Sequence, residues 1–273
     1  MSPSHERNDR KRPQKPGGER AFRGHRGAPR ARADGAGAEW LWGWHAVVAA
    51  LANERRAPAK RILASPDRAR ALTERFGKLP ALETMEANLI AQQLPAGAVH
   101  QGIALKAGEL EPLSVEEMGE APAGVILMLD QVTDPQNVGA IFRSAAAFGA
   151  RGVILQDRHA PPLVGALAKA AAGAVDALPH ARAVNLSRAL ETLSDLGWRT
   201  VGLDGGADEV LEAVFDSRPT VLVLGSEGEG LRRLVAEHCD VLARIPMPGG
   251  FESLNVSAAA AVALYAATSP RKT

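Results

Sequence analysis

The sequence has one cysteine and no long apolar run. Its only cysteine, Cys239, excludes a disulfide within the chain, so we expect a reducing compartment and a cytoplasmic location. No stretch reaches the ~18 consecutive apolar residues of a membrane span, and no apolar segment follows the first charges as in a secretory signal. We therefore expect no membrane span. We also predict no metal site. Because no base and orienting group surround Cys239, we expect its thiol to pack at a helix end.

Aromatic residues are scarce as well, at 4% of the chain. The apolar fraction of 46% is normal for a globular protein, so the core must rest on alanine, valine, leucine and isoleucine. With 273 residues, the chain has room for one large or two modest domains.

The net charge of +1 hides an uneven distribution. Residues 1–38 carry ten Lys/Arg and four Asp/Glu, a balance of +6. Residues 39–107 carry nine and six, a balance of +3, and residues 108–273 carry thirteen and twenty-one, a balance of −8. This asymmetry predicts that a polyanion would be held mainly by the N-terminal part, although a basic tail can also be only a solvated arm.

Composition divides the chain into four parts. Residues 1–38 are rich in Arg, Pro, Gly and Ala and are expected to be a disordered basic tail. Residues 39–107 form a small α/β unit, and residues 108–122 form a polar linker with one helical turn. Residues 123–273 form the main α/β domain.

The periodicity of apolar residues predicts the elements of both units. In the small unit we expect an entry turn at Trp42 and a helix to Leu51, strands at 61–64 and 102–105, and helices at 67–76 and 89–94. In the main unit we expect strands at 125–129, 152–155, 175–178, 200–203, 221–224 and 242–245, alternating with helices at 138–148, 163–172, 186–196, 231–238 and 254–267. Short apolar strands alternating with helices predict a mostly parallel sheet covered on both faces.

The first segment with chemical potential follows the strand at 125–129. Asp134-Pro135 is a turn dipeptide, and Asn137 suits a helix N-cap. Arg143 follows six residues later, so it and Asn137 are expected to reach one ligand, and an arginine fork suits a phosphate. A helix cap and a surface arginine would explain the same residues.

The second segment, Leu224-Gly225-Ser226-Glu227-Gly228-Glu229-Gly230-Leu231, is a glycine-rich turn between a strand and a helix. Its two carboxylates disfavour a phosphate cradle and suit a ligand with a positive or hydrogen-donating part. Neither a Walker sequence nor the GxGxxG fingerprint is present, so a plain Rossmann nucleotide site is disfavoured. An ordinary strand-to-helix turn remains an alternative.

The third segment is Arg244 to Ala258. A loop with Pro246, Pro248, Gly249 and Gly250 leads to the polar stretch Ser253-Leu254-Asn255-Val256-Ser257, which opens an alanine-rich helix. A helix start leaves free backbone N–H groups, so this segment and the glycine turn predict a ligand pocket.

Together the three segments resemble the signature motifs of the SpoU/TrmH family of SPOUT methyltransferases, RNA ribose 2′-O-methyltransferases that use S-adenosylmethionine. The resemblance covers about residues 123–268 and rests on Asp134-Pro135-x-Asn137-x-Gly139-x-x-x-Arg143-Ser144, Leu224-Gly225-Ser226-Glu227-Gly228-x-Gly230-Leu231, Ile245-Pro246-Met247 and Ser253-Leu254-Asn255-Val256-Ser257. Upstream, Gly43-x-His45-Ala46-Val47 and His100-Gln101-Gly102 resemble the ends of the L30-like substrate-binding domain of bacterial 23S rRNA guanosine-2′-O-methyltransferases.

The resemblance implies a deep trefoil knot in the main domain and a homodimer with its sites at the subunit interface. It implies that loops 225–230 and 245–256 hold the cofactor, and that the small side chains of helix 258–267 allow close packing between subunits. The cofactor-binding residues implied are Leu203, Leu224, Gly225, Glu227, Gly230, Ile245, Met247, Ser253, Leu254 and Asn255.

The catalytic residues implied are Asn137, Arg143, Glu227 and Asn255. In the reaction a ribose 2′-oxygen attacks the sulfonium methyl. A guanidinium has a pKa above ~12, so we favour Arg143 as a phosphate ligand and oxyanion stabiliser over Arg143 as a base. Asn137 would orient Arg143 or the ribose, and Glu227 and Asn255 would hold the nucleotide and the cofactor-side network.

Several points stay open at this stage. Ala258–Ala261 is plainer than the family's usual run, and Phe251 either covers the adenine or packs. Trp40, Trp42 and Trp44 either stack on unpaired bases or belong to the core. An rRNA substrate is favoured by the small N-terminal domain, and the alternatives are a tRNA substrate and a non-catalytic RNA-binding ribosome-assembly factor.

Overall fold

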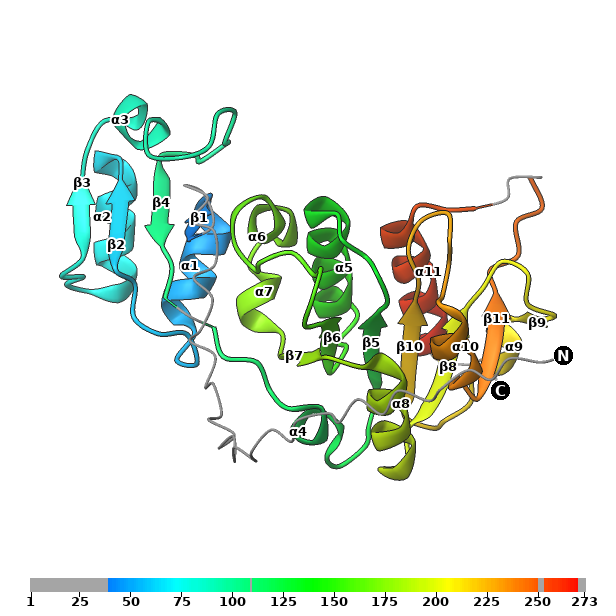
Figure 1. Cartoon of the computed structure of the whole chain (residues 1–273). Helices are drawn as coiled ribbons and strands as arrows, with labels where there is room; N and C mark the ends of the chain where they lie inside the picture. Colours follow the sequence, from blue (N-terminus) through cyan, green and yellow to red (C-terminus); the bar gives the residue numbers. More distant parts are fainter. Residues whose placement is uncertain (1–38, 109, 250–252, 270–273) are drawn as a thin grey trace, which may run out of the picture. The chain divides into compact units, whose positions relative to one another are not determined.

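The computed structural model describes residues 39–108, 110–249 and 253–269 (Figure 1). These residues belong to one compact unit of the chain. The predictions for the tail at 1–38 and for Phe251 lie outside the described residues.

The first sheet has four strands in the order β1-β4-β2-β3. β4 pairs antiparallel with β1 and β2, and β2 pairs parallel with β3. The strands are β1 (Trp40–Trp42), β2 (Arg61–Ala64), β3 (Leu82–Thr84) and β4 (Ile103–Lys106), and the helices are α1 (Trp44–Ala52), α2 (Pro66–Phe76) and α3 (Ala87–Ala91).

Two strands of this sheet escaped the sequence analysis. The entry turn predicted at Trp42 is wrong, because Trp40–Trp42 is a strand whose Leu41 faces Leu105 of β4. The turn lies one residue later, at Gly43. β3 has only one half-buried and two exposed residues, so no apolar pattern marks it.

The second sheet has seven strands in the order β7-β6-β5-β10-β8-β11-β9, and all its pairs are parallel. The strands are β5 (Val125–Leu129), β6 (Gly152–Gln156), β7 (His180–Ala183), β8 (Arg199–Leu203), β9 (Glu209–Val210), β10 (Thr220–Leu224) and β11 (Val241–Arg244). The helices that follow or connect them are α5 (Pro135–Ala147), α6 (Gly165–Ala171), α7 (Ala174–Ala177), α8 (Leu186–Asp195), α9 (Leu211–Val214), α10 (Arg233–Glu237) and α11 (Val256–Thr268). The predicted α/β fold with a mostly parallel sheet is confirmed.

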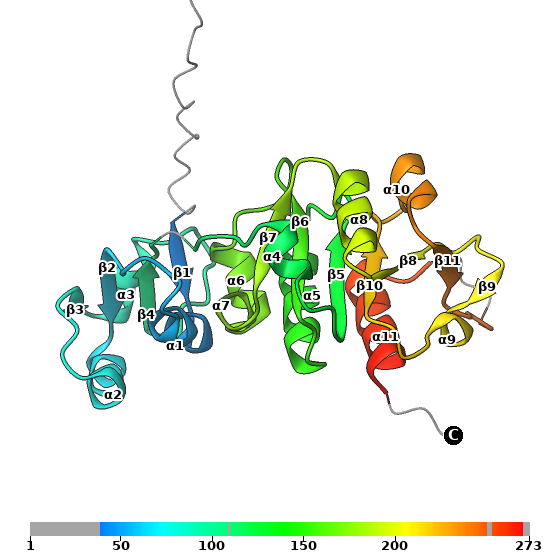
Figure 2. The same cartoon turned by 90° about the horizontal axis from the view of Figure 1, so that it is seen from below.

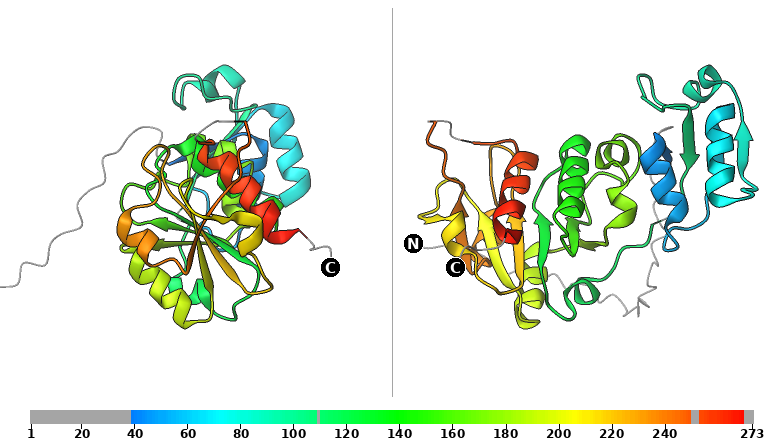
Figure 3. Two further views of the ribbon diagram at one scale, coloured as in Figure 1. Left: turned by 90° about the vertical axis from the view of Figure 1, so that its right-hand side faces the viewer. Right: turned by 180° about the vertical axis from the view of Figure 1, so that it is seen from behind.

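Helices cover both faces of this sheet (Figures 2 and 3). Along β5, Val125, Leu127 and Leu129 face the core shared with α5, α6, α7, α9 and α11, whereas Ile126 and Met128 face the core shared with α4 (Val115–Gly119), α8 and α10. A strand buried on both sides reads as a continuous apolar run, which is why the sequence reveals it.

The strand predicted at 175–178 is wrong. Those residues are mostly helix α7, and the strand is β7 at His180–Ala183, where two of the four residues are polar. A short apolar run does not distinguish helix from strand, and β7 lies at the sheet edge, where a continuous apolar run is not required.

The segment predicted as a linker packs closely on the second sheet. It contains α4 (Val115–Gly119), which begins with a capping box between Ser114 and Glu117. Met118 is buried, and the indole Nε1 of Trp198 donates to the carbonyl of Gly119 over 2.8 Å. The domain boundaries stay a prediction.

A buried ion pair connects the segment after α1, beside the first sheet, to helix α7, beside the second sheet. Arg56 donates through Nε to Oδ1 of Asp176 over 2.6 Å and through Nη2 to Oδ2 over 3.1 Å. Its Nη1 donates to the carbonyl of Gly108 over 3.0 Å, so the guanidinium also holds the connecting segment. Apolar contacts support it, since Ala168 of α6 belongs to the core formed by α1, α2 and β4.

No helix in the described part of the chain combines the length and apolar character needed to cross a bilayer.

Candidate functional site

The candidate site lies at the carboxyl ends of the central strands of the second sheet. β5 and β10 pair in register as far as Leu129 and Leu224, so the loops after them begin side by side. β8 and β11 pair nearby, with Leu203 opposite Ala243. In a parallel sheet a ligand is expected beyond these strand ends.

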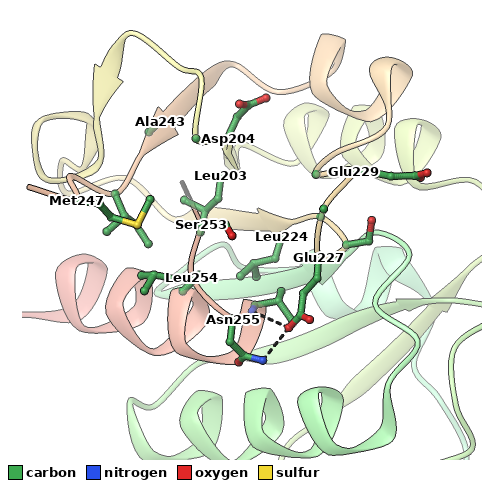
Figure 4. Close-up of a pocket in the computed structure, with 18 residues that line it drawn as sticks. Leu203, Asp204, Leu224, Glu227, Glu229, Ala243, Met247, Ser253, Leu254 and Asn255 are labelled. Carbon is green, nitrogen blue, oxygen red and sulfur yellow. Dashed lines mark hydrogen bonds between the residues drawn. The ribbon is translucent and has the colours of Figure 1, made fainter. Parts of the chain in front are cut away.

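A cavity of about 680 Å³ occupies this position (Figure 4). The residues that line it come from the ends of β8, β10 and β11, from the glycine turn and from the start of α11. They are Leu203, Asp204, Gly205, Leu224, Gly225, Ser226, Glu227, Gly228, Glu229, Gly230, Ala243, Ile245, Met247, Ser253, Leu254, Asn255, Val256 and Ala259.

The glycine turn has a shape that only glycine permits at its first position. A Cβ on Gly225 would lie 2.1 Å from the carbonyl carbon of Gly230. The turn is closed by two backbone hydrogen bonds of 3.1 Å between Ser226 and Gly230. The backbone of Gly225 is therefore bare where it borders the cavity.

The carboxylate of Glu227 collects three hydrogen bonds on one oxygen. Oε1 accepts from Nδ2 of Asn255 over 2.7 Å, from Nδ2 of Asn137 over 3.0 Å and from the backbone N–H of Val256 over 3.2 Å. The amide of Asn255 also donates to Oδ1 of Asn137 over 2.9 Å. These bonds join all three predicted segments in one polar network.

Asn255 is also the N-cap of α11. Its Oδ1 accepts from the backbone N–H groups of Ser257 and Ala258 over 3.0 and 3.3 Å. The predicted helix start at residue 254 is therefore wrong by two residues. Because one face of the Asn255 amide caps the helix, the other is fixed towards Glu227.

The cap of α5 also differs from the prediction. Asp134, not Asn137, is the N-cap, and its carboxylate accepts from the backbone N–H groups of Gln136 and Asn137. Asn137 lies in the first turn, which frees its side chain for Glu227.

A buried carboxylate braces the two loops. Asp130 is fully buried after β5, and its oxygens accept from the backbone N–H of Arg232 over 2.9 Å and from its Nε over 2.8 Å. Arg232 directly follows the glycine turn. The ion pair thus fixes the far end of the turn to β5.

Three carboxylates and no basic residue appear among the described residues that line the cavity. Asp204 and Glu229 join Glu227, and apolar side chains such as Leu203, Leu224 and Met247 supply the rest of the wall (Figure 4). This lining suits a ligand that is partly apolar and carries positive charge. Glu229 is one of the two turn carboxylates that the sequence suggested for a positive ligand, whereas Asp204 was missed although it directly follows a predicted strand.

All ten predicted cofactor-binding residues line this one cavity. Three of the four predicted catalytic residues, Asn137, Glu227 and Asn255, form the hydrogen-bonded network at its edge. Arg143 is not among the lining residues and borders a second cavity instead. Six residues along a helix place the two side chains about 120° apart around its axis, so Asn137 contacts Glu227 while Arg143 borders the second cavity, and the expectation that both reach one ligand stays a prediction.

Two smaller predictions are resolved by burial. Trp40 and Trp42 are buried in an apolar cluster with Leu63 and Ile90, so they belong to the core, whereas Trp44 is half-buried. Cys239 follows α10 and packs on the core shared with α4, α8 and α10, at a helix end as predicted. Burial raises its thiol pKa to about 12, so the thiol stays protonated and unreactive.

Within the described residues, no three or more His, Cys, Asp or Glu side chains group as metal ligands.

Comparison with known proteins gives one consistent family. The model of the SpoU rRNA Methylase family matches residues 124–265. A Mycolicibacterium gilvum protein described as an uncharacterized tRNA/rRNA methyltransferase is 36% identical over 96% of this chain and 84% of its own length. Other mycobacterial relatives are matched over 54% to 64% of their length, so the chain spans a little over half to about two thirds of those proteins.

Solved structures agree with this result. The AdoMet-bound rRNA methyltransferase from Sinorhizobium meliloti has a TM-score of 0.71 and 27% identity, over 84% of this chain and 85% of that one. A structure described as an RNA 2′-O ribose methyltransferase has a TM-score of 0.67 and 26% identity, over 84% and 86% of the two chains.

Proposed function

Since the chain belongs to the SpoU rRNA methylase family, we propose that it transfers a methyl group from S-adenosylmethionine to a ribose 2′-hydroxyl of RNA. The observation that carries the proposal is the cavity in Figure 4, whose lining joins the second and third segments of the sequence motif, with Asn137 of the first segment hydrogen-bonded to Glu227 at its edge. The S. meliloti structure contains AdoMet, and it matches most of this chain.

The residues present fit this cofactor. A cavity of about 680 Å³ lies within the range of ~300–1,000 Å³ typical of small-molecule sites. Leu203, Leu224 and Met247 suit an adenosine and a methionine chain, and the carboxylates suit a positive sulfonium and amino group. When bound, S-adenosylmethionine supplies the electrophilic methyl group.

The Asn137–Glu227–Asn255 network has a positioning role. Glu227 holds both amides and the first N–H of α11, which fixes the entrance of the cavity. An enzyme gains rate when the reacting groups are held in place before reaction. The network therefore orients the ribose against the cofactor and keeps the strand ends together.

Arg143 has no hydrogen-bond or ion-pair partner among the described residues, which suits a side chain reserved for substrate. A guanidinium does not give up its proton near neutral pH, so Arg143 binds the phosphate next to the reacting ribose and stabilises the developing oxyanion. It does not line the cavity of its own protomer. We therefore include a homodimer in the proposal, with the exposed Val262 and Tyr265 of α11 in its interface.

The substrate within this proposal is rRNA, with a guanosine of 23S rRNA as the modified nucleotide. The S. meliloti protein is described as an rRNA methyltransferase, and the small first sheet accompanies the main domain in this chain. The relative from M. gilvum is described as acting on tRNA or rRNA, so a tRNA substrate is the second candidate. The predicted trefoil knot also remains part of the proposal.

One variant separates binding from chemistry. Arg143→Ala should abolish methyl transfer to RNA and leave the affinity for S-adenosylmethionine, measured by calorimetry, near that of the wild type. Loss of cofactor affinity with surviving transfer would overturn the role given to Arg143.

A further inference from the structure

A second cavity, of about 950 Å³, is lined on α5 by Arg143 and Ala146. It is bordered by α1, α5, α6 and α7, with one residue from α2. Its lining includes four basic residues, His45, Arg75, Arg143 and Lys169, and no acidic residue among those the structure describes. We call it the basic groove.

Arg143 and Lys169 of the basic groove have no carboxylate partner among the described residues, unlike other arginines of the chain. Arg56, Arg61 and Arg232 each pair with a carboxylate. Neither the Arg143 nor the Lys169 side chain makes a hydrogen bond or ion pair with any described residue. Burial lowers the pKa of Lys169, so its ammonium group loses hydration without gaining an anion. Such a group favours an anionic ligand.

The position of Lys169 depends on a glycine in the first sheet's part of the chain. Gly43 has a φ of 86°, and a Cβ there would lie 2.5 Å from Nζ of Lys169 and 3.2 Å from Oε1 of Gln101. The lysine of α6 therefore lies across the start of α1, where any larger residue would displace it. The sequence shows Gly43 and Lys169 far apart, and only the fold brings them together.

The rim of the groove carries an aromatic side chain beside more positive charge. Trp44 lines the groove and is half-buried, and the guanidinium of Arg68 lies 4.9 Å from the centre of its ring. Basic residues that alternate with aromatic ones suit a strand with phosphates and bases.

We propose that the basic groove binds the sugar–phosphate backbone of the substrate RNA beside the modified nucleotide, with Lys169 and Arg75 continuing the track that begins at Arg143. The inference rests on the proposed function in taking RNA as the polyanion. It gives the RNA contact to folded residues from both parts of the chain, in addition to the basic tail.

The test uses the full chain and a fluorescein-labelled poly(U) oligonucleotide as the probe. Fluorescence anisotropy is measured over a range of salt concentrations for the wild type, Lys169→Gln, Arg75→Gln and the double variant. The control is Arg70→Gln, because Arg70 shares α2 with Arg75, is exposed beside Asp67 and does not line the groove. The wild type and all variants retain residues 1–38, so differences in RNA affinity measure the contribution of the basic groove.

Each groove variant should bind about three- to tenfold more weakly at physiological salt. Each should also reduce the slope of log K against log salt by about 0.7, the value for one phosphate contact on a single strand. Lys169→Arg should restore both quantities, because it keeps the charge. Arg70→Gln should match the wild type, and calorimetry should show unchanged cofactor affinity for all variants.

Unchanged affinity and slope in Lys169→Gln and Arg75→Gln would overturn the inference, as would equal losses in Arg70→Gln. Failure of Lys169→Arg to restore binding in a protein with normal thermal unfolding would also overturn it. Methyl transfer by the wild type is measured separately, so a rejected groove leaves the proposed function standing.

Discussion

The side-chain amide of Asn255 donates to the carboxylate of Glu227 over 2.7 Å and so joins two loops that are 28 residues apart in the sequence. The same asparagine caps α11 with its other end. Asn255 therefore fixes the loop before α11, the start of α11 and the glycine turn. A substitution at Asn255 can separate the effect of the helix cap from the effect of the link to Glu227.

Asn255→Asp should keep the helix cap and break the link to Glu227. The oxygen that accepts from Ser257 and Ala258 remains, but an oxygen replaces the Nδ2 donor that faces Glu227 Oε1. Two carboxylates in contact raise the pKa of one of them. We expect about 1–3 kcal/mol of lost stability at pH 7 and at least a tenfold loss of methyl transfer.

The stability deficit of Asn255→Asp should become smaller as the pH is lowered. The raised pKa means that lowering the pH protonates the pair and removes the repulsion, so urea unfolding at pH 5 should recover part of the deficit. Asp134→Asn, which keeps an acceptor at the cap of α5 and does not contact Glu227, is the control. A deficit in Asn255→Asp that is the same at both pH values would contradict the account.

Removing one partner of the Arg56–Asp176 pair should be severe. Both side chains are buried, so Arg56→Ala leaves the Asp176 carboxylate, among the residues described, with the side-chain amide of Asn53 at 3.1 Å as its remaining side-chain partner. We expect a loss of about 3–5 kcal/mol in the free energy of unfolding. Arg61→Ala removes the exposed pair with Glu83 and should change the stability little in the same denaturant titration, because solvent screens this pair. Comparable losses in the two variants would show that burial does not make the Arg56–Asp176 pair more important for stability than the exposed pair.

His180 should make the protein sensitive to mild acid. Burial, followed by the charges of Arg182, Arg55 and Arg56, lowers its pKa from 6.5 to about 4. Above pH 6.5 the ring is neutral in both the folded and unfolded states and has no effect. Between pH 6.5 and 4 only the unfolded state takes up the proton, so stability should fall by up to about 3 kcal/mol as the pH decreases.

In the variant His180→Asn, the free energy of unfolding should decrease less between pH 6.5 and pH 4 than it does in the wild type. Guanidinium unfolding between pH 7 and pH 4 measures it, and the comparison is the slope of stability against pH, not the absolute value. An unchanged slope in His180→Asn would assign the acid sensitivity to other groups.

Cys239 should resist alkylation in the folded protein. With its pKa raised to about 12 by burial, almost none of the thiol is ionised at pH 8.5, so iodoacetamide should label native protein slowly and unfolded protein rapidly. The unfolded thiol ionises near its ordinary pKa, so this group should lower stability as the pH rises above about 9. Mass spectrometry measures the labelling, and rapid labelling under native conditions would contradict the burial.

The sequence predicts the central part of the fold better than its edges. β5 and β10 are apolar throughout because they are buried on both faces, so their positions were correct. β3, β7 and β9 lie at sheet edges and lack that pattern. Their residues gain strand conformation from pairing with a neighbour, which a local pattern does not record.

The sequence likewise predicts one part of the candidate site and does not reveal the other. The motif residues of the second and third segments line one cavity, and Asn137 of the first segment bonds to Glu227 beside it, because neighbouring parallel strands end at one edge of the sheet. The contact of Asn137 with Glu227 depends on where α5 begins, because Asp134 rather than Asn137 caps the helix. The approach of Lys169 to Gly43 depends on tertiary packing and has no local signal.

The central claim is methyl transfer to a ribose oxygen, and mass spectrometry of nucleosides tests it most directly. The full chain is incubated with isotope-labelled S-adenosylmethionine and with purified rRNA or tRNA from cells that lack this gene, and the RNA is then digested. The account predicts label in 2′-O-methylated nucleosides from rRNA, with 2′-O-methylguanosine from the 23S fraction. Label on a base, or no label in either RNA, would contradict it.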